Sequence, residues 1–129
     1  MIEKEFQDFW KQIGIPCYSS NNVPLKDRNG KDIKMPYLTY DYAVTEFATS
    51  AFIQVVLWTR SVASIAELSE LSDRIVKLIP AYAGAGITLP DGRGVIRIYR
   101  GTPFMQSYPQ DDKDVKANYF VLEVRTYIM

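Results

Sequence analysis

The segment 36–80 constrains the fold of this chain most, because two strands and a helix follow one another in it with little sequence between them. Alternating side chains predict a strand over 36–47 and a second strand, apolar on both faces, over 50–60. Leucines and isoleucines at helical spacing then predict a helix over 65–79, which a capping box begins and a proline ends. The order strand, strand, helix predicts a sheet with a helix packed across it.

The N-terminal part of the chain predicts a short helix followed by a polar loop. An apolar stripe with three large aromatic side chains predicts a helix over 2–13 that ends at Gly14 and packs into the core. The stretch 17–34 is polar and rich in turn formers, which predicts a loop. Two further interpretations of this stretch stay open: a small hairpin at Asn29-Gly30, or an arm that becomes ordered on assembly.

The C-terminal part of the chain predicts a hairpin and a final strand. The runs 87–89 and 95–100 flank a turn of proline, aspartate and glycines, and 118–128 alternates as the last strand. The segment 101–117 lacks a period and is expected to be irregular. Together the elements predict a single α+β domain, with an antiparallel sheet of about four to five strands and two helices packed on one face.

The composition argues against several classes of function. The chain has 129 residues, with 15 basic and 15 acidic side chains, no histidine and one cysteine. Balanced charge does not favour nucleic acid or an anionic membrane, and no apolar run approaches the about 20 residues of a membrane helix. Without histidine the chain lacks the commonest general base and the commonest ligand of zinc and iron. We therefore expect no enzymatic activity, no cofactor and no bound metal.

Three features of the chain are candidate sites of chemistry. Cys17 is better explained as a small apolar residue than as a nucleophile, since no histidine is available to activate it. Asp111, Asp112 and Asp114 lie close together, but they lack the spacing of a calcium loop, so a charged surface loop explains them better. Asp41 shares a strand face with other polar side chains, which leaves open a small polar pocket.

Several stretches of the chain, taken in order, resemble the tail terminator (tail completion) proteins of long-tailed bacteriophages and prophages. The resemblance covers about residues 35–129 and rests on the order and spacing of Pro-Tyr-Leu-Thr-Tyr at 36–40, the strand 53–60, the helix that follows it, Arg-Gly-Thr-Pro-Phe-Met-Gln at 100–106 and the strand 119–127. It implies a small α+β domain that closes into a hexameric ring without catalytic activity. Such a ring caps the tail tube, stops its polymerisation and presents the surface that joins the tail to the head.

The resemblance also implies the partners and the location of the protein. The expected partners are further copies of the same chain, the tail tube protein and a head–tail connector protein. DNA is expected to pass through the ring without being bound specifically, and no membrane is involved. The expected location is the virion tail, and the cytoplasm of the bacterial host during assembly.

Subunits of a ring contact their neighbours through surfaces that are enriched in aromatic residues, methionine and arginine. The residues that we expect in such a contact are Trp58, Arg60, Phe104, Met105, Tyr108, Tyr119 and Tyr127. The acidic residues Asp111, Asp112 and Asp114 are expected either to meet a basic surface on the tube or to line the ring opening, where they would repel DNA.

Other functions stay open on the sequence alone. A head-closure or neck component would have the same size and the same lack of catalytic residues. A small ligand-binding or enzymatic domain would use a pocket near Asp41, and an intracellular binding adaptor would need no pocket at all. A deep pocket around Asp41 would favour an enzyme, whereas a flat apolar flank would favour an assembly protein.

Overall fold

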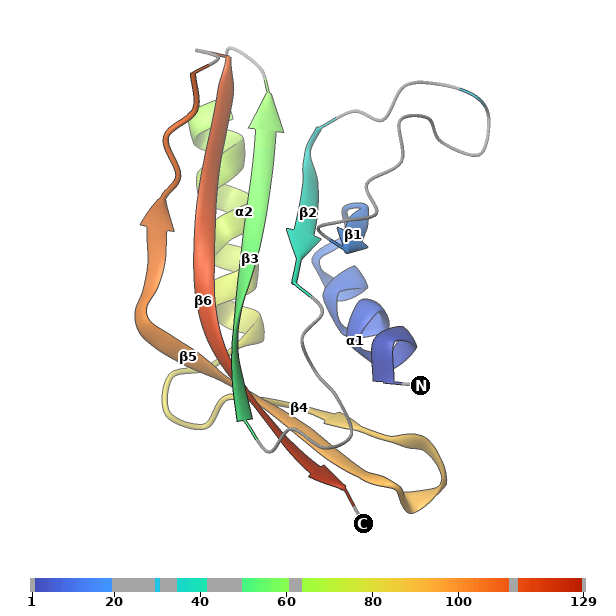
Figure 1. Ribbon diagram of the computed structural model, residues 1–129. Helices are drawn as coiled ribbons and strands as arrows, with labels where there is room; N and C mark the ends of the chain where they lie inside the picture. Colours follow the sequence, from blue (N-terminus) through green and yellow to red (C-terminus); the bar gives the residue numbers. More distant parts are fainter. Residues whose placement is uncertain are drawn as a thin grey trace.

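The computed structural model describes residues 2–19, 30, 35–41, 50–60, 64–111 and 114–128. These residues form a sheet that two α-helices cover on one side (Figure 1). The helices are α1 (Ile2–Trp10) and α2 (Ser64–Leu78), with the 3₁₀ turns η1 (Lys11–Ile13) and η2 (Pro90–Gly92). The strands are β1 (Cys17–Ser19), β2 (Tyr37–Tyr40), β3 (Ser50–Arg60), β4 (Ala85–Thr88), β5 (Gly94–Ser107) and β6 (Val115–Ile128).

The described strands form one six-stranded sheet in the order β1-β2-β3-β6-β5-β4. The α+β class and the two helices are confirmed, and the prediction of about four to five antiparallel strands is roughly consistent with the sheet but differs from it in two respects. The sheet has a sixth strand, β1, and β1 pairs with β2 in parallel, with Cys17 opposite Leu38. At three residues β1 is too short to show an alternating pattern, and its pairing depends on β2, which lies far along the chain.

Long antiparallel pairing between β3 and β6 forms the centre of the sheet. Its register runs from Ser50 opposite Arg125 to Arg60 opposite Val115. Alternate side chains of both strands point to the same side, where they are buried: Ile53, Val55 and Leu57 of β3, and Phe120, Leu122 and Val124 of β6. This side is called the inner face below. The alternation that the sequence predicts for 118–128 is confirmed.

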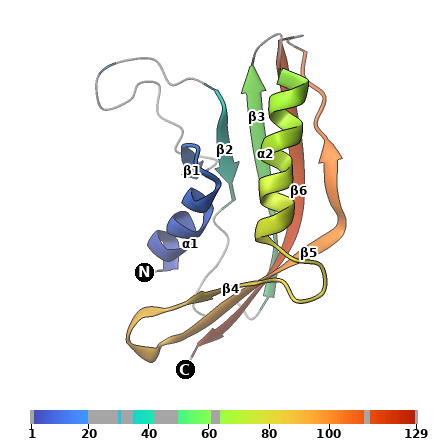
Figure 2. The same ribbon diagram turned by 180° about the vertical axis from the view of Figure 1, so that it is seen from behind.

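Helix α2 packs across the inner face over β3 and β6 (Figure 2). Its buried stripe contains Leu71, Ile75 and Ile79, at the spacing that the sequence predicts. At its C-terminal end, Arg100 of β5 donates hydrogen bonds to the carbonyl oxygens of Val76 (2.8 Å) and Ile79 (2.7 Å). These bonds satisfy carbonyl groups that a helix end leaves without partners, so they connect α2 to β5.

Helix α1 fills the remainder of the same core with aromatic side chains. Phe6 and Trp10 are fully buried, and the ring of Phe6 lies edge-on to Tyr40 of β2 at 5.5 Å between centroids. The helix continues through η1 and ends at Gly14, whose φ of 89° is in the left-handed region. The predicted helix 2–13 and its place in the core are therefore confirmed.

The prediction that 101–117 is irregular is wrong, because β5 and β6 extend into it from either end. The pairing of β5 with β6 shifts register between Arg100 and Met105. Gly101 lies in this shift, and a Cβ atom there would come within 2.7 Å of the carbonyl oxygen of Val121. A register shift interrupts the alternation of side chains, so the sequence pattern does not reveal a continuous strand.

Some sequence predictions fall on residues outside the described ranges. The strand predicted over 36–47 is confirmed over β2, and its continuation from residue 42 lies outside them. Within the predicted loop 17–34, the segment 17–19 forms β1 and Gly30 is described; the remaining positions lie outside. Within the described part of the chain, no helix combines the length and the apolar character that crossing a lipid bilayer requires.

We expect Ile75→Ala to lower the free energy of unfolding by roughly 2–5 kcal/mol, because Ile75 is completely buried between α2 and the sheet and its truncation leaves a cavity. Urea denaturation followed by circular dichroism measures this change. The matched control is Lys77→Ala on the exposed side of the same helix, which should change stability by less than about 0.5 kcal/mol. An equal change in the free energy of unfolding for the two substitutions would contradict the burial of Ile75 between α2 and the sheet.

Cys17 is buried in the core, where its Sγ lies 3.3 Å from the carbonyl oxygen of Trp10. Burial raises the pKa of its thiol from 9.0 to about 12, with Lys11 opposing the change. A thiol held protonated in this way is a poor nucleophile. The interpretation of Cys17 as a structural residue therefore gains support from its surroundings.

The raised pKa of Cys17 predicts how reactivity and stability depend on pH. At pH 8, a chromogenic disulfide should label the folded protein far more slowly than the protein unfolded in guanidinium chloride.

Because the folded pKa of Cys17 lies above the unfolded one, this thiol stabilises the fold below about pH 9, and its contribution decreases as pH rises towards 12. Urea titrations should show a steeper loss of stability between pH 9 and 11 for the wild type than for Cys17→Ala. Rapid labelling of the folded protein would contradict the burial and the raised pKa of the Cys17 thiol.

Candidate protein-interaction surface

The second face of the sheet differs from the inner face because no described helix covers it (Figures 1 and 2). Side chains that alternate with the buried ones point to this side, which is called the outer face below. On β3 they include Phe52, Val56 and Trp58, and on β6 they include Tyr119 and Arg125, as the register of the two strands requires. The outer face is therefore the part of the fold to search for a binding surface.

Three aromatic rings meet on the outer face and form what is called the aromatic cluster below. The ring of Tyr108 lies 5.7 Å from Trp58 and 5.8 Å from Tyr119, measured between centroids. The indole Nε1 of Trp58 donates a hydrogen bond to Oγ1 of Thr39 on β2 (3.0 Å). The backbone N–H of Tyr108 donates to the carbonyl oxygen of Ala117 (2.9 Å). These contacts fix the three rings, so they present a preformed surface.

The register shift in β5 places Tyr108 on the outer face. Before the shift, Ile96, Ile98 and Arg100 point to the inner face, so even-numbered residues face the core. After the shift, Met105 pairs with Phe120 and the alternation is reversed. Tyr108 would point towards α2 if β5 were regular, and the irregularity near Gly101 turns it towards Trp58 instead.

The outer face near the aromatic cluster is well packed. Ala117, directly opposite Trp58, is 3% exposed, and Val56 is 8% exposed, as expected if neighbouring aromatic rings shield them. Next to the cluster, Tyr18 of β1 and Tyr37 of β2 lie edge to face at 5.8 Å. Burial raises the pKa of Tyr37, an effect that the positive charge of Arg60 partly opposes. The apolar part of the face thus extends from β1 to the end of β5.

Towards the other end of the outer face, an arginine cluster replaces the apolar surface. The guanidinium groups of Arg97 and Arg125 lie 5.8 Å and 5.3 Å from the ring centroid of Tyr99. Arg125 also pairs with Glu123 at 2.6 Å, a hydrogen bond that raises the pKa of Arg125. Arg97 donates to the carbonyl oxygen of Ala83. Arginine held beside tyrosine in this way is common in protein interfaces.

Between the two clusters lies an exposed aromatic side chain. Phe52 of β3 is 70% exposed and lies directly opposite Glu123. Phe52 is not among the residues that the sequence predicts for an interface, and neither are Tyr18, Tyr37 and Tyr99. The missing information was the register between strands, which decides that these side chains share the face of Trp58.

The structure brings together some of the residues predicted for an interface. Trp58, Tyr108 and Tyr119 form the aromatic cluster. Arg60 lies beyond this cluster at the end of β3, opposite Val115, and is exposed. Tyr127, which is 51% exposed, lies at the far end of the outer face, opposite Val95.

Two other residues predicted for an interface do not lie on the outer face. The ring of Phe104 is 5.5 Å from Phe120, and the guanidinium group of Arg100 lies 4.6 Å from its centroid, so Phe104 packs against the core. Met105 pairs with Phe120 on the inner side and is 45% exposed at the edge of the sheet. Both residues belong to the region of the register shift, which turns them away from Trp58.

Three of the acidic residues considered in the sequence, Asp41, Asp111 and Asp114, belong to the described part of the chain. Asp111 and Asp114 are exposed in the connection from β5 to β6, and Asp112 is outside the described residues. Asp41 continues the pairing of β2 with β3: its Oδ2 accepts a hydrogen bond from the N–H of Gln54 (3.3 Å), and its own N–H donates to the carbonyl oxygen of Gln54 (3.1 Å). Among the described residues, no group of three His, Cys, Asp or Glu side chains is arranged to hold a metal ion.

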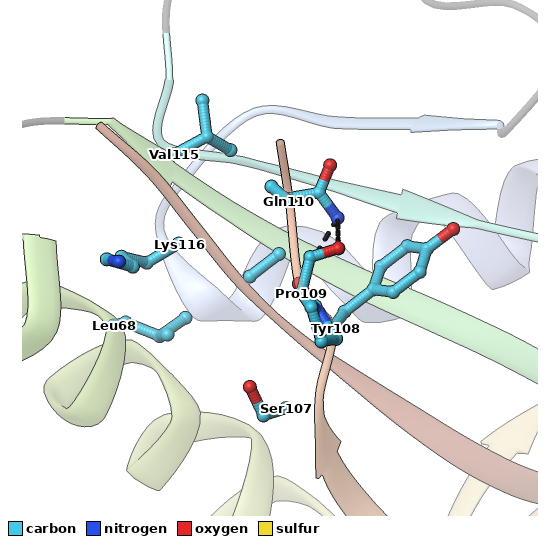
Figure 3. A pocket seen from close by; sticks show the side chains of 8 residues that line it. Leu68, Ser107, Tyr108, Pro109, Gln110, Val115 and Lys116 are labelled. Carbon is cyan, nitrogen blue, oxygen red and sulfur yellow. Dashed lines mark hydrogen bonds between the residues drawn. The ribbon is translucent and has the colours of Figure 1, made fainter. Parts of the chain in front are cut away.

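A recess of about 380 Å³ lies between α2 and the turn after β5 (Figure 3). Leu68 borders it from the helix, and the segments Ser107–Gln110 and Val115–Ala117 complete it. The side-chain amide of Gln110 donates to the carbonyl oxygens of Tyr108 (3.2 Å) and Pro109 (3.0 Å). Among the described residues of this lining, Lys116 is the one charged side chain. Asp41 does not border it.

We expect Gly101→Ala to disturb the aromatic cluster from a distance. The new methyl group would lie 2.7 Å from the carbonyl oxygen of Val121, so the register shift must change and Tyr108 must move away from Trp58. The substitution should cost roughly 1–3 kcal/mol of stability and shift the fluorescence of Trp58 to longer wavelength. Trp10, which is completely buried, provides an unchanged background. The matched control is Thr102→Ala at an exposed position, which should alter neither quantity.

Comparisons of the chain with protein-family models, with curated proteins and with solved structures find no significant match.

Proposed function

We propose that this chain is a non-enzymatic structural protein similar to the tail terminators of long-tailed phages. In this proposal it forms a ring, with about six copies as the resemblance implies, caps the tail tube and stops its polymerisation. The ring then provides the surface that joins the tail to the head, so its partners are the tube protein and a head–tail connector protein. The sequence resemblance motivates this proposal, and the outer face of the sheet supports it.

The observation that carries the proposal is an outer face rich in exposed aromatic and arginine side chains. From the usual spacing between strands and rise per residue, the outer surfaces of β2, β3, β6 and β5 together cover roughly 600 Å². This area is close to the about 800 Å² that each partner buries in a stable interface. Phe52 and Tyr127 are more than half exposed on this face. Interface centres are enriched in such residues, so a protein contact explains the face better than a small-molecule site does.

In a closed ring, each subunit uses two different surfaces, because every contact is heterologous. We propose the outer face as one of these two surfaces. The exposed side chain of Met105, at the edge of β5, belongs to a separate region and is available for the second contact. Asp111, Asp112 and Asp114 keep their proposed role at the ring opening or against the tube.

A head-closure or neck component would use the same kind of face, and it remains the alternative among assembly proteins. A ligand-binding or enzymatic site at Asp41 has less support, because one oxygen of this carboxylate accepts a hydrogen bond from the backbone of β3. Among the described residues that line the recess beside α2, none is acidic. The geometry therefore favours assembly over catalysis.

Light scattering over a concentration series, with negative-stain images of the same samples, tests the proposal. The wild type should form closed rings of about six subunits. Phe52→Ser should shift the equilibrium towards monomer by at least about ten-fold, since truncating an interface hot spot costs 2 kcal/mol or more. The control is Tyr82→Ser, which removes a fully exposed aromatic ring from the turn between α2 and β4.

Two results would contradict this proposal in different ways. A wild type that is monomeric at every concentration would contradict spontaneous ring formation. Rings that persist unchanged in Phe52→Ser would show that the subunits meet through another surface. Replacing the acidic residues 111, 112 and 114 together by lysine tests their separate role, which fails if assembly and DNA passage stay intact.

A further inference from the structure

The edge of the sheet at β4 has backbone groups that no described strand pairs with. β4 is the last strand of the sheet, and its partner is β5. The N–H of Leu89 donates to the carbonyl oxygen of Gly94 (2.9 Å), so Leu89 and Ile87 direct their backbone groups towards β5. Because antiparallel strands alternate, the N–H and C=O groups of Gly86 and Thr88 point away from β5.

Helix α1 lies beside this edge (Figures 1 and 2). A recess lies between the helix and the strand. The recess has a volume of about 320 Å³ and is lined by Glu5, Asp8, Phe9 and Gln12 of α1 and by Gly86, Ile87 and Thr88 of β4. This volume is at the lower end of the range for ligand sites in proteins. Two carboxylates, those of Glu5 and Asp8, belong to its lining.

The two carboxylates in the recess differ in their partners. Asp8 pairs with Lys4 at 3.2 Å and with Lys11 at 3.6 Å. Oε2 of Glu5 is shielded from solvent and has no hydrogen-bond partner among the described residues. A shielded carboxylate oxygen without a donor is unfavourable and rare in folded proteins. A group that donates a hydrogen bond and carries a positive charge would satisfy Glu5.

We propose that this recess binds a short extended segment of a partner protein that carries a lysine or an arginine. The backbone of the segment pairs with the outward N–H and C=O groups of Gly86 and Thr88, as in β-strand addition. Its cationic side chain extends to the carboxylate of Glu5 and donates a hydrogen bond to it. The site is separate from the outer face, so it does not depend on ring formation.

A peptide segment fits these groups better than a metal ion does. The edge of β4 alternates N–H donors with C=O acceptors, and an extended backbone uses both kinds of group whereas a metal ion uses acceptors alone. The described residues of the lining also include no third carboxylate and no histidine that a metal site would use. The charge of Glu5 decides the sign of the side chain that the segment must carry.

Titration of the ¹⁵N-labelled protein with a synthetic peptide, followed by NMR, tests this site. The probe is acetyl-Thr-Val-Lys-Val-Thr-amide, and the matched peptide has norleucine in place of lysine. We expect saturable shifts of the Gly86 and Thr88 amide signals with the lysine peptide, and at least about ten-fold weaker binding of the norleucine peptide, a difference of about 1.4 kcal/mol.

Two substitutions separate the two parts of the site. Glu5→Gln removes the charge and should weaken binding of the lysine peptide to the level of the norleucine peptide. Thr88→Pro removes an N–H that points away from β5, which edge strands tolerate, and should weaken binding of both peptides. Glu70→Gln, on the exposed side of α2, is the control and should bind as the wild type does. Circular dichroism establishes that each variant is folded.

The inference is overturned if millimolar lysine peptide shifts neither amide signal, or if both peptides bind equally. It is also overturned if folded Glu5→Gln binds the lysine peptide as tightly as the wild type. None of these results bears on ring formation, which light scattering measures on protein without peptide. Saturable binding that depends on lysine, on Glu5 and on the edge of β4 supports the site.

Discussion

The register between β3 and β6 is the constraint on which the rest of this structure depends. It places Ile53 opposite Leu122 and Val55 opposite Phe120, so one face of the central pair is aliphatic and aromatic and is buried under α2. A slip by one residue would move this whole set to the opposite face. The same register places Trp58 and Phe52 on the outer face, so burial of the core and exposure of the binding surface have a single cause.

The irregular part of β5 reverses the alternation of its side chains, so that Tyr108 points to the outer face. Arg100 holds the strand to the end of α2 through two carbonyl oxygens, and the register changes directly after it. Gly101 leaves room for the carbonyl of Val121 within the shift. As a consequence Tyr108 reaches Trp58 and Tyr119, and three strands contribute to one surface. The outer face and the recess beside α1 are two separate surfaces, the first rich in aromatic and arginine side chains and the second lined by two carboxylates.

Much of the fold was predictable because hydrophobic periodicity is a local property. The helices, β3, the hairpin and the inner faces of β3 and β6 all appear in alternating or helical patterns of the sequence. β1 was not predictable, since three residues carry no period and its pairing depends on Leu38, which is distant in the chain. Of the residues proposed for an interface, Trp58, Tyr108 and Tyr119 meet, whereas Phe104 packs against Phe120.

The sequence by itself determined the fold class, the position of both helices and which faces of β3 and β6 are buried. It also determined the absence of histidine, which limits the available chemistry. Only the tertiary structure decided which side chains share a surface, because this depends on strand register and on the shift in β5. It likewise decided that Glu5 lies beside the free edge of β4, since α1 and β4 are far apart in the chain and meet only when the sheet curls.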